Sequence, residues 1–283
     1  MPPSTSATQT PIARDAAVAT AAQRLTTARL TGVPCAPIRD LIDATDIQLG
    51  YAVQQQVNAE RLAAGARVVG RKIGLTSPAV QAQLGVDRPD LGVLFDDMAH
   101  PADTPVPLGA LLQPKVEAEI AFVLAADLSE GDLDLAQVTA AVDHAVAAIE
   151  ICDSRIADWD IAFADTVADN ASSGCYVLGE ERRRVTGPDA FVPVEAAMRM
   201  TVSGQEDSTG DGAACLGDPL LALQWLARTS RELGDPLRAG QVVLSGALGP
   251  MRPAAPGAEV TVEITGLGSV AISFAPTTSA GEQ

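Results

Sequence analysis

The sequence predicts an α+β fold, with a helical region at the N-terminus and a larger β-rich region after it. The first observation is the helical spacing of apolar residues in two stretches, residues 12–30 and 46–64. The second is a change of character from residue 68 onward, where short strand-like runs alternate with Gly, Pro and Asp turns. The third is size, because 283 residues that are 47% hydrophobic can bury a substantial core.

These observations divide the chain into four predicted parts. They are a disordered tail at residues 1–11, a helical region at 12–66, a catalytic β-rich domain at 67–276 and a flexible tail at 277–283. The two helices of the second part are separated by a turn that contains Gly32 and Pro34.

Turn-forming residues set the expected elements of the β-rich part. The predicted strands cover residues 68–69, 92–95, 116–124, 148–151, 174–178, 198–202, 242–245, 259–264 and 268–274. Apolar residues at helical spacing predict a helix over 135–146. A later helix is predicted over 219–233, with Asp218 as its N-cap and Gly234 as its stop. Residues 266–268 fit a hairpin turn and do not complete a dinucleotide-binding motif.

The charge balance excludes several classes of partner. The net charge is −17, from 19 basic and 36 acidic residues, and no basic cluster interrupts it. This argues against a nucleic-acid partner and against anionic membrane surfaces. With only 2 His and 3% aromatic residues, a histidine metal site, a base-stacking surface and a Ser-His-Asp triad are all disfavoured.

The cysteines and the N-terminus predict a cytoplasmic protein. The four cysteines, at positions 35, 152, 175 and 215, form neither a C-x-x-C pair nor a zinc spacing, so reduced thiols are expected. Cys152 would share a strand face with Glu150, where a small apolar filler is its ordinary role. The N-terminus has no secretory signal, and no apolar run reaches the ~18 residues of a membrane span.

The most informative strand carries two carboxylates on one face. Glu117 and Glu119 alternate with apolar residues, so their α-carbons should lie roughly 6–7 Å apart on the same side. Two solvated glutamates on an exposed face would explain the pattern. A divalent cation between them would explain it too, and Mg²⁺ or Mn²⁺ suit oxygen ligands best.

A third carboxylate stands where a core residue is expected. Glu150 lies in the run Ala-Ile-Glu-Ile, after the predicted helix, and is therefore expected near the start of a strand. Glutamate is seldom fully buried without a partner. The partner is either a metal shared with the other two glutamates or an arginine such as Arg155.

Five motifs occur in a fixed order along the chain, namely GRKIGLT at residues 70–76, GVDRPDLGVL at 85–94, EAEIA at 117–121, EICDSR at 150–155 and DTVADNASSG at 165–174. Together they resemble the hydratase/decarboxylase branch of the fumarylacetoacetate hydrolase superfamily. Three later segments are closer to the hydratases than to the 4-oxalocrotonate decarboxylases, namely LGDPL at 216–220, WLAR at 225–228 and LSGALGPM at 244–251. The resemblance covers residues 38–274.

The resemblance implies a mixed β-roll core and a set of site residues. It implies that Glu117, Glu119 and Glu150 hold Mg²⁺ or Mn²⁺. It also implies that Lys72 and Asp90 are catalytic, with Asp90 paired to the lysine and either residue a candidate to take the proton of the attacking water. From the residues alone, Lys72 would be an exposed lysine and Asp90 a turn residue. The substrate-binding residues that the resemblance implies are Leu75, Ser172, Ser173, Ser245 and Gly246.

The resemblance further implies a metal-dependent hydratase. It would add water to 2-hydroxypenta-2,4-dienoate, through the 2-oxo-3-enoate tautomer, to give 4-hydroxy-2-oxopentanoate in the meta-cleavage degradation of aromatic compounds. Alternatives are a 4-oxalocrotonate decarboxylase, a hydratase of a dicarboxylate such as 2-oxohept-4-ene-1,7-dioate, and an acylpyruvate hydrolase. An alternative of another class is a non-catalytic partner subunit of a decarboxylase. A homo-oligomer is expected, and a complex with a pathway decarboxylase or aldolase is a further possibility.

Overall fold

The computed structural model describes residues 11–77, 81 and 86–276. The predicted tails at residues 1–11 and 277–283 lie outside them, except that Pro11 begins the first helix. Among the described helices, none combines the length and the apolar character that crossing a membrane requires.

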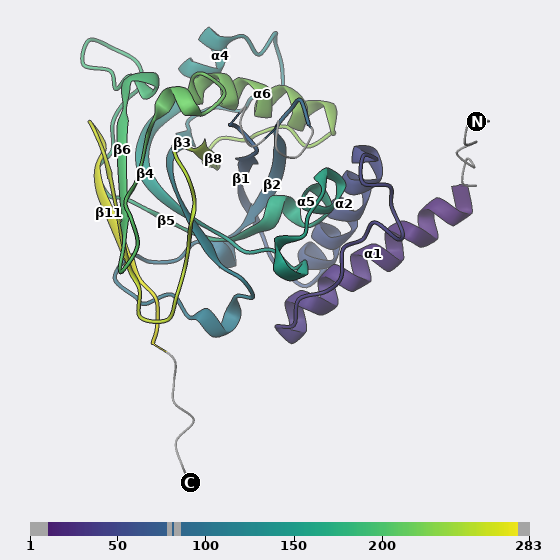
Figure 1. Ribbon diagram of the computed structural model, residues 1–283. Coiled ribbons are helices and arrows are strands. Elements are labelled where there is room, and N and C mark those ends of the chain that lie inside the picture. The colour runs from purple at the N-terminus through teal and green to yellow at the C-terminus, as the bar shows by residue number, and fades with distance from the viewer. Residues whose placement is uncertain (1–10, 78–80, 82–85, 277–283) are drawn as a thin grey trace, which may run out of the picture.

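The N-terminal region is helical, as predicted. Helix α2 (Ile47–Ala63) packs against both α1 (Pro11–Thr31) and α5 (Phe163–Ala168). The Asp46 side chain accepts a hydrogen bond from the Leu49 backbone N–H and caps α2. Their shared core is a separate apolar cluster of mostly small and aliphatic side chains. Figure 1 shows these helices on one side of the molecule, beside the β-rich part.

The β-rich part consists of two sheets within the described residues. The larger sheet has the order β2-β1-β8-β3-β4-β5, with β9 added beside β3. Its strands are β1 (Val68–Gly74), β2 (Asp90–Phe95), β3 (Lys115–Leu124), β4 (Val142–Cys152), β5 (Ser173–Leu178), β8 (Val242–Ala247) and β9 (Arg252–Pro253). The smaller sheet, β11-β10-β6-β7, contains β6 (Ala197–Val202), β7 (Ser208–Asp211), β10 (Glu259–Ile264) and β11 (Gly268–Ser273).

Two further helices and several short 3₁₀ turns complete the fold. Helix α6 (Pro219–Glu232) lies beside α4 (Leu135–Ala140) at one end of the roll (Figure 1). As predicted, Asp218 caps α6, since its side chain accepts a hydrogen bond from Leu220 N. The 3₁₀ turns are η1 (Asp96–Met98), η2 (Leu108–Ala110), η3 (Ala157–Trp159), η4 (Asn170–Ser172), η5 (Pro193–Glu195) and η6 (Gly212–Ala214).

Alternation along β3 explains how one strand serves both a core and a site. Val116, Ile120 and Phe122 face the smaller sheet and belong to the main apolar cluster, together with residues of β6 and β10. Glu117 and Glu119 occupy the opposite face, which looks into the curl of the larger sheet. The sequence therefore places apolar side chains where the two sheets pack and carboxylates inside the roll.

The predicted helix at residues 135–146 is wrong in its second half. Helix α4 ends at Ala140, and β4 begins at Val142 and pairs with β3 along its length. Glu150 consequently lies near the end of its strand, not near the start. The apolar residues of 142–146 are compatible with the spacing of a helix and with that of a strand. Hydrogen bonding to β3 makes this segment a strand. Helix α5 and strand β7 were not predicted; all six residues of α5 are buried, which removes the amphipathic signal.

Candidate active site

The candidate site lies inside the curl of the larger sheet. Lys72 on β1 and Glu150 on β4 form an ion pair with Nζ and Oε1 3.2 Å apart. Strands β8 and β3 lie between β1 and β4 in the sheet, so the two side chains meet only because the sheet curves around them. Both are almost fully buried. The predicted alternative, in which Glu150 pairs with Arg155, is wrong, because Arg155 pairs with Asp169.

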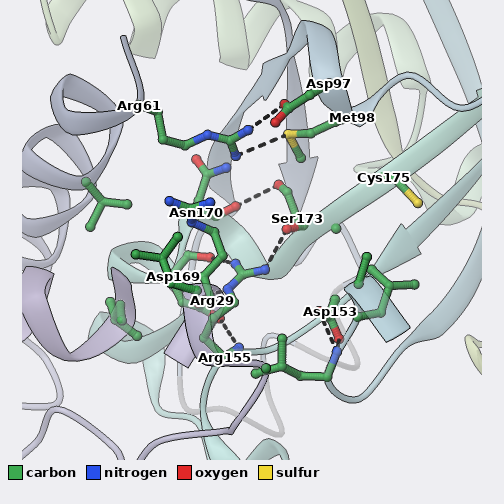
Figure 2. Close-up of a pocket in the computed structure, with 18 of the residues that line it drawn as sticks. Arg29, Arg61, Asp97, Met98, Asp153, Arg155, Asp169, Asn170, Ser173 and Cys175 are labelled. Carbon is green, nitrogen blue, oxygen red and sulfur yellow. Dashed lines mark hydrogen bonds and ion pairs between the residues drawn. The ribbon is translucent and has the colours of Figure 1, made fainter. Parts of the chain in front are cut away.

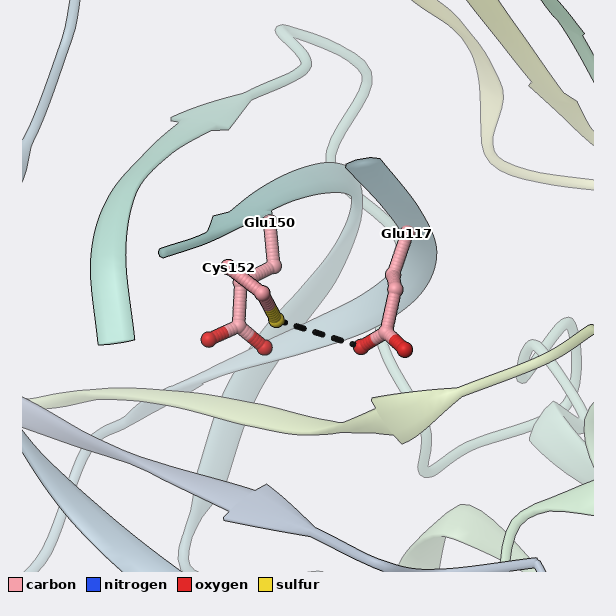
Figure 3. A group of neighbouring side chains, drawn as sticks. All are labelled: Glu117, Glu150 and Cys152. Carbon is pink, nitrogen blue, oxygen red and sulfur yellow. Dashed lines mark hydrogen bonds between the residues drawn. The ribbon is translucent and has the colours of Figure 1, made fainter. Parts of the chain in front are cut away.

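The register of β3 and β4 concentrates negative charge. Glu117 lies directly opposite Glu150, and Cys152 lies one pleat further along the same face. The Cys152 thiol donates to Glu117 Oε2 over 3.5 Å, and one ligand atom from each of these three residues lies within 4.8 Å of the others (Figure 3). Like charges directly opposite each other destabilise a sheet. A positive charge or a bound proton is therefore required to offset the repulsion between Glu117 and Glu150.

Glu119 extends the cluster toward β8. It is fully buried, its Oε2 accepts a hydrogen bond from Gly246 N at 2.8 Å, and its Oε1 has no partner. Gly246 has a φ of +114°, and a Cβ there would lie 2.4 Å from the Thr76 side chain. Only glycine permits this conformation and this close approach. The predicted site residue Gly246 thus contacts a predicted metal ligand through its backbone.

Asp90 lies beside Lys72 at the start of β2. It is 1% exposed, its Oδ2 accepts a hydrogen bond from Thr166 Oγ1 at 3.1 Å, and its Oδ1 has no partner. A Cβ on Gly74 would lie 2.2 Å from Asp90 Oδ1, so the glycine is needed for the carboxylate to fit. Lys72 Nζ donates to the carbonyl of Ala171 at 2.9 Å, and its ion pair within 4 Å is with Glu150, not Asp90.

Burial and mutual repulsion shift the ionisation of these groups. Burial, together with Glu150, raises the pKa of Glu117 to about 7. Burial and the neighbouring glutamates also raise the pKa of Glu119, and burial raises that of Asp90. Burial opposes the charged form of Lys72, but the surrounding carboxylates outweigh it and raise the pKa of the ammonium well above its ordinary value. These carboxylates therefore favour the ammonium form of Lys72 in the metal-free protein.

Several buried carboxylate oxygens at the site have no hydrogen-bond partner, which is what a site for a divalent cation requires. Asp90 Oδ1, Glu119 Oε1 and both Glu150 oxygens are buried without a hydrogen-bond partner, and the contact of Glu150 with Lys72 lacks hydrogen-bond geometry. Buried carboxylate oxygens are nearly always paired or bound to a metal. Oxygen ligands of this kind suit Mg²⁺, Mn²⁺ or Ca²⁺. The donor set fits a divalent cation held by glutamates, with Cys152 as a softer neighbour.

The predicted substrate-binding residues lie around this cluster in two groups. Ser245 is fully buried with an unpartnered Oγ and precedes Gly246 on β8. Leu75 follows β1 with a left-handed φ of 57°. Ser172 and Ser173 direct their hydroxyls elsewhere, toward Asp169 Oδ2 and the Asn170 carbonyl. The loop that carries them reaches the site through a backbone carbonyl.

A separate cavity of about 510 Å³ lies behind that loop. It is bounded by α1, α2, residues 109–112 and residues 168–170 and 173–175, and Figure 2 shows Arg29, Arg61 and Arg155 around it. None of the site carboxylates lines it. The two histidines are also outside the site, because His100 contacts the Thr104 carbonyl and His144 contacts Asp143.

Three contributors to the site were not assigned a role in it from the sequence. Thr166 orients Asp90 from α5, and the Ala171 carbonyl holds Lys72. Asn170, Ala171 and Ser172 all have left-handed φ values, an unusual run for residues other than glycine. Cys152 was interpreted as a filler, yet it touches Glu117. Only its spacing of two from Glu150 indicated this position.

The matching family model is the fumarylacetoacetate (FAA) hydrolase C-terminal family, over residues 67–274. The chain belongs to the fumarylacetoacetate hydrolase family. It is 52% identical over 254 residues to a 2-keto-4-pentenoate hydratase of Paraburkholderia xenovorans, covering 90% of this chain and 93% of that protein. It is 40% identical over 259 residues to a 2-hydroxyhexa-2,4-dienoate hydratase of Comamonas testosteroni, covering 91% and 97%. Both the predicted superfamily and its hydratase branch are confirmed.

A solved structure of the family has the same fold. The 4-oxalocrotonate decarboxylase of Pseudomonas putida G7, complexed with magnesium and adipate, superposes with a TM-score of 0.86 at 32% identity, covering 92% of this chain and 98% of that one. The predicted α+β roll with N-terminal helices is thereby confirmed. That structure holds a divalent cation, as expected for this branch of the family.

Proposed function

We propose that this fumarylacetoacetate hydrolase family member is a 2-keto-4-pentenoate hydratase. It adds water to 2-hydroxypenta-2,4-dienoate, through the 2-oxo-3-enoate tautomer, and yields 4-hydroxy-2-oxopentanoate, a step of aromatic degradation by meta-cleavage. The observation that carries the proposal is the set of buried, unpartnered carboxylate oxygens around Lys72. The identity of about half of all residues with a hydratase of that name over nearly the whole chain supports the substrate.

Glu117, Glu119 and Glu150 are the proposed ligands of Mg²⁺ or Mn²⁺. Bound there, the cation acts as a Lewis acid on a 2-oxo acid and offsets the repulsion among the three glutamates. Gly246 fixes Glu119 by its backbone hydrogen bond, and Lys72 fixes Glu150 by its charge. The protein thus orients two of the three ligands before any cation binds.

Asp90 is the proposed base for the attacking water. Its Oδ1 is free to accept a proton, its Oδ2 is held by Thr166, and burial raises its pKa toward the range useful to a general base. In the metal-free protein the carboxylates around Lys72 raise the pKa of its ammonium. Its role is then to attract the anionic substrate and to stabilise negative charge that develops on it. A positioned base of this kind typically contributes ~10²–10⁴-fold.

Ser245, Gly246 and Leu75 are proposed to contact the substrate from the β8 and β1 side. The unpartnered Ser245 hydroxyl is the best donor among them. Ser172 and Ser173 are proposed to shape the opposite side of the site, through the backbone of their loop. We also propose a homo-oligomer as the working form, and association with a decarboxylase or aldolase of the same degradation sequence.

The test is a spectrophotometric assay of the chelated protein with freshly generated 2-hydroxypenta-2,4-dienoate. Loss of the dienol absorbance should return when Mg²⁺ or Mn²⁺ is added, with 4-hydroxy-2-oxopentanoate as product. Release of CO₂ from 4-oxalocrotonate, without turnover of the pentadienoate, would instead make the protein a decarboxylase. Absence of turnover with either substrate, in a protein that co-purifies with an active decarboxylase, would favour a non-catalytic partner.

A further inference from the structure

A buried glutamine of the N-terminal region reaches the strand that carries Asp90. Gln54 lies on α2 and is almost fully buried. Its Nε2 donates to the Leu91 carbonyl at 2.9 Å and to the Val167 carbonyl at 2.8 Å. Both partners are acceptors, so a side-chain amide, whose nitrogen carries two donors, suits this position. The proposed function gives α2 no role so far.

The two carbonyls are next to the two side chains that form the proposed base. Leu91 follows Asp90 on β2. Val167 follows Thr166 on α5, and Thr166 Oγ1 donates to Asp90 Oδ2 at 3.1 Å. The single side chain of Gln54 therefore ties together the two backbone segments whose relative position decides whether this hydrogen bond forms.

Strand β2 depends on such support because it lies at the edge of its sheet. Among the described residues it pairs with β1 only, so its outer backbone groups have no neighbouring strand. Side-chain amides take that place. Gln54 donates to the Leu91 carbonyl, and the Asn170 side chain accepts from Val93 N at 2.8 Å and donates to Val93 O at 2.9 Å. Two amides from distant parts of the chain thus hold the edge of β2.

Helix α2 lies close enough to α5 and to the base to provide this support. A Cβ on Gly50 would lie 3.1 Å from the Ala164 carbonyl oxygen of α5, so the glycine permits a close approach of the two helices. Tyr51 and Gln54 are three residues apart and share one face of α2. Burial and the charge of Asp90 raise the pKa of the Tyr51 hydroxyl, which is consistent with that face lying beside the base.

We propose that Gln54 is a positioning residue for the base, and that it holds β2 and α5 so that Thr166 Oγ1 meets Asp90 Oδ2. This role rests on the proposed function, in which Asp90 takes the proton of the attacking water. Gln54 acts through the backbone of Leu91 and Val167 and not on the substrate itself. The N-terminal helices thereby contribute to turnover as well as to the stability of the fold, because a small displacement of a catalytic group lowers the rate steeply.

The experiment measures kcat, KM for 2-hydroxypenta-2,4-dienoate and Mn²⁺ affinity in Gln54→Met, which keeps the length of the side chain and removes both donors. We expect kcat to fall roughly tenfold, with KM and Mn²⁺ affinity changed by less than about twofold, because the base is displaced while the metal ligands stay in place. Asn58→Leu is the matched control, since it alters a second buried amide of α2 whose Oδ1 has no hydrogen-bond partner among the described residues. The control should keep the wild-type kcat.

A double-mutant cycle with Thr166→Val separates positioning of the base from a general loosening of the fold. If Gln54 acts through the hydrogen bond between Thr166 and Asp90, the loss of kcat caused by Gln54→Met should be at least about twofold smaller in the Thr166→Val protein than in the wild type. Gln54→Asn keeps the amide on a shorter side chain. It should show the same selective loss of kcat, and it replaces Gln54→Met if that variant does not fold.

Equal kcat in Gln54→Met and the control, parallel losses of kcat and Mn²⁺ affinity, or fully additive effects with Thr166→Val would each overturn the positioning role. Asp90→Asn distinguishes this failure from a failure of the proposed function. A large loss of kcat in Asp90→Asn beside an unimpaired Gln54→Met would mean that the base is correct and Gln54 does not position it. An unimpaired Asp90→Asn would overturn the assignment of the base, and the role of Gln54 with it.

Discussion

Two buried acidic regions lie on either side of the loop at residues 169–174, and they differ in how their charges are matched. On the helical side, Asp169 accepts from the Arg155 backbone and guanidinium, and Arg155 also donates to the Ser173 carbonyl. On the roll side, four carboxylates face the single ammonium of Lys72. The first region is a closed network, and the second is left with excess negative charge.

This difference in charge matching indicates that the Arg155–Asp169 pair is structural, whereas the carboxylates around Lys72 form a functional site. Asp169 has no unpartnered oxygen, whereas Asp90, Glu119 and Glu150 together have four. A fold does not gain stability by burying unmatched carboxylates, so their presence indicates a ligand that completes them. Removing a charge should therefore mainly affect activity in the roll and mainly affect stability on the helical side.

The largest expected effect is on turnover, from Glu150→Gln. Hydratase activity should fall by about 10³-fold, since Lewis-acid stabilisation is worth several kcal/mol and each 1.36 kcal/mol is tenfold. In the metal-free protein the melting temperature should change little, because the loss of the ion pair with Lys72 is offset by removal of the repulsion with Glu117. Activity assays and thermal melts on the same preparation check both. Unaltered activity would contradict the functional interpretation of this region.

The opposite result is expected on the helical side. Arg155→Met leaves Asp169 buried and unpaired, which should lower the free energy of unfolding by about 3–5 kcal/mol. Urea denaturation measures it, with Arg238→Met as an exposed control that should leave stability nearly unchanged. A stability loss no greater than that of the control would remove the contrast between the two regions.

The pH dependence of stability should differ between wild type and Glu117→Gln. The pKa of Glu117 in the metal-free folded protein is about 7, above its ordinary 4.5, so the folded state binds the proton more tightly. Its contribution to stability is present at low pH and is lost as the pH rises from about 4.5 through about 7. Denaturation curves over this range should show a steeper decline in the wild type. Parallel curves for the two proteins would contradict the assignment.

The smallest effect is expected from Thr166→Val. It removes the hydrogen bond to Asp90 Oδ2 and preserves the shape of the side chain. A net loss of about 0.5–1.5 kcal/mol corresponds to a roughly 2–10-fold drop in kcat. Steady-state kinetics would show the drop in kcat with little change in Mn²⁺ affinity. A change in metal affinity without one in kcat would mean that Thr166 acts on the ligands and not on Asp90.

Much of the fold could be predicted, because the spacing of apolar residues and the capping residues lie within each helix or strand or next to it. The alternation of β3, the capping of α6 by Asp218 and the length of α2 are all specified by nearby residues. The helix predicted over 135–146 failed because pairing of β4 with β3 is a long-range effect that local spacing does not contain.

The site was predictable in its charges but not in its connections. Carboxylates embedded in apolar strands are conspicuous in sequence, and family motifs added Lys72 and Asp90. The curl that brings Lys72 onto Glu150 depends on the order of strands, which no single segment encodes. The supports given by Thr166, Gly246 and the Ala171 carbonyl come from distant parts of the chain, so they emerge only from the folded structure.

Binding of Mn²⁺ to the chelated protein is the most direct test of the central contrast. Titration followed by electron paramagnetic resonance should reveal one Mn²⁺ site per chain in the wild type. Glu150→Gln should weaken it by at least about tenfold, while Asp97→Asn, which alters an exposed acidic residue beside Arg61, should leave it intact. Equal Mn²⁺ affinity in all three proteins, or none in the wild type, would contradict the conclusion that the unmatched carboxylates of the roll are a metal site.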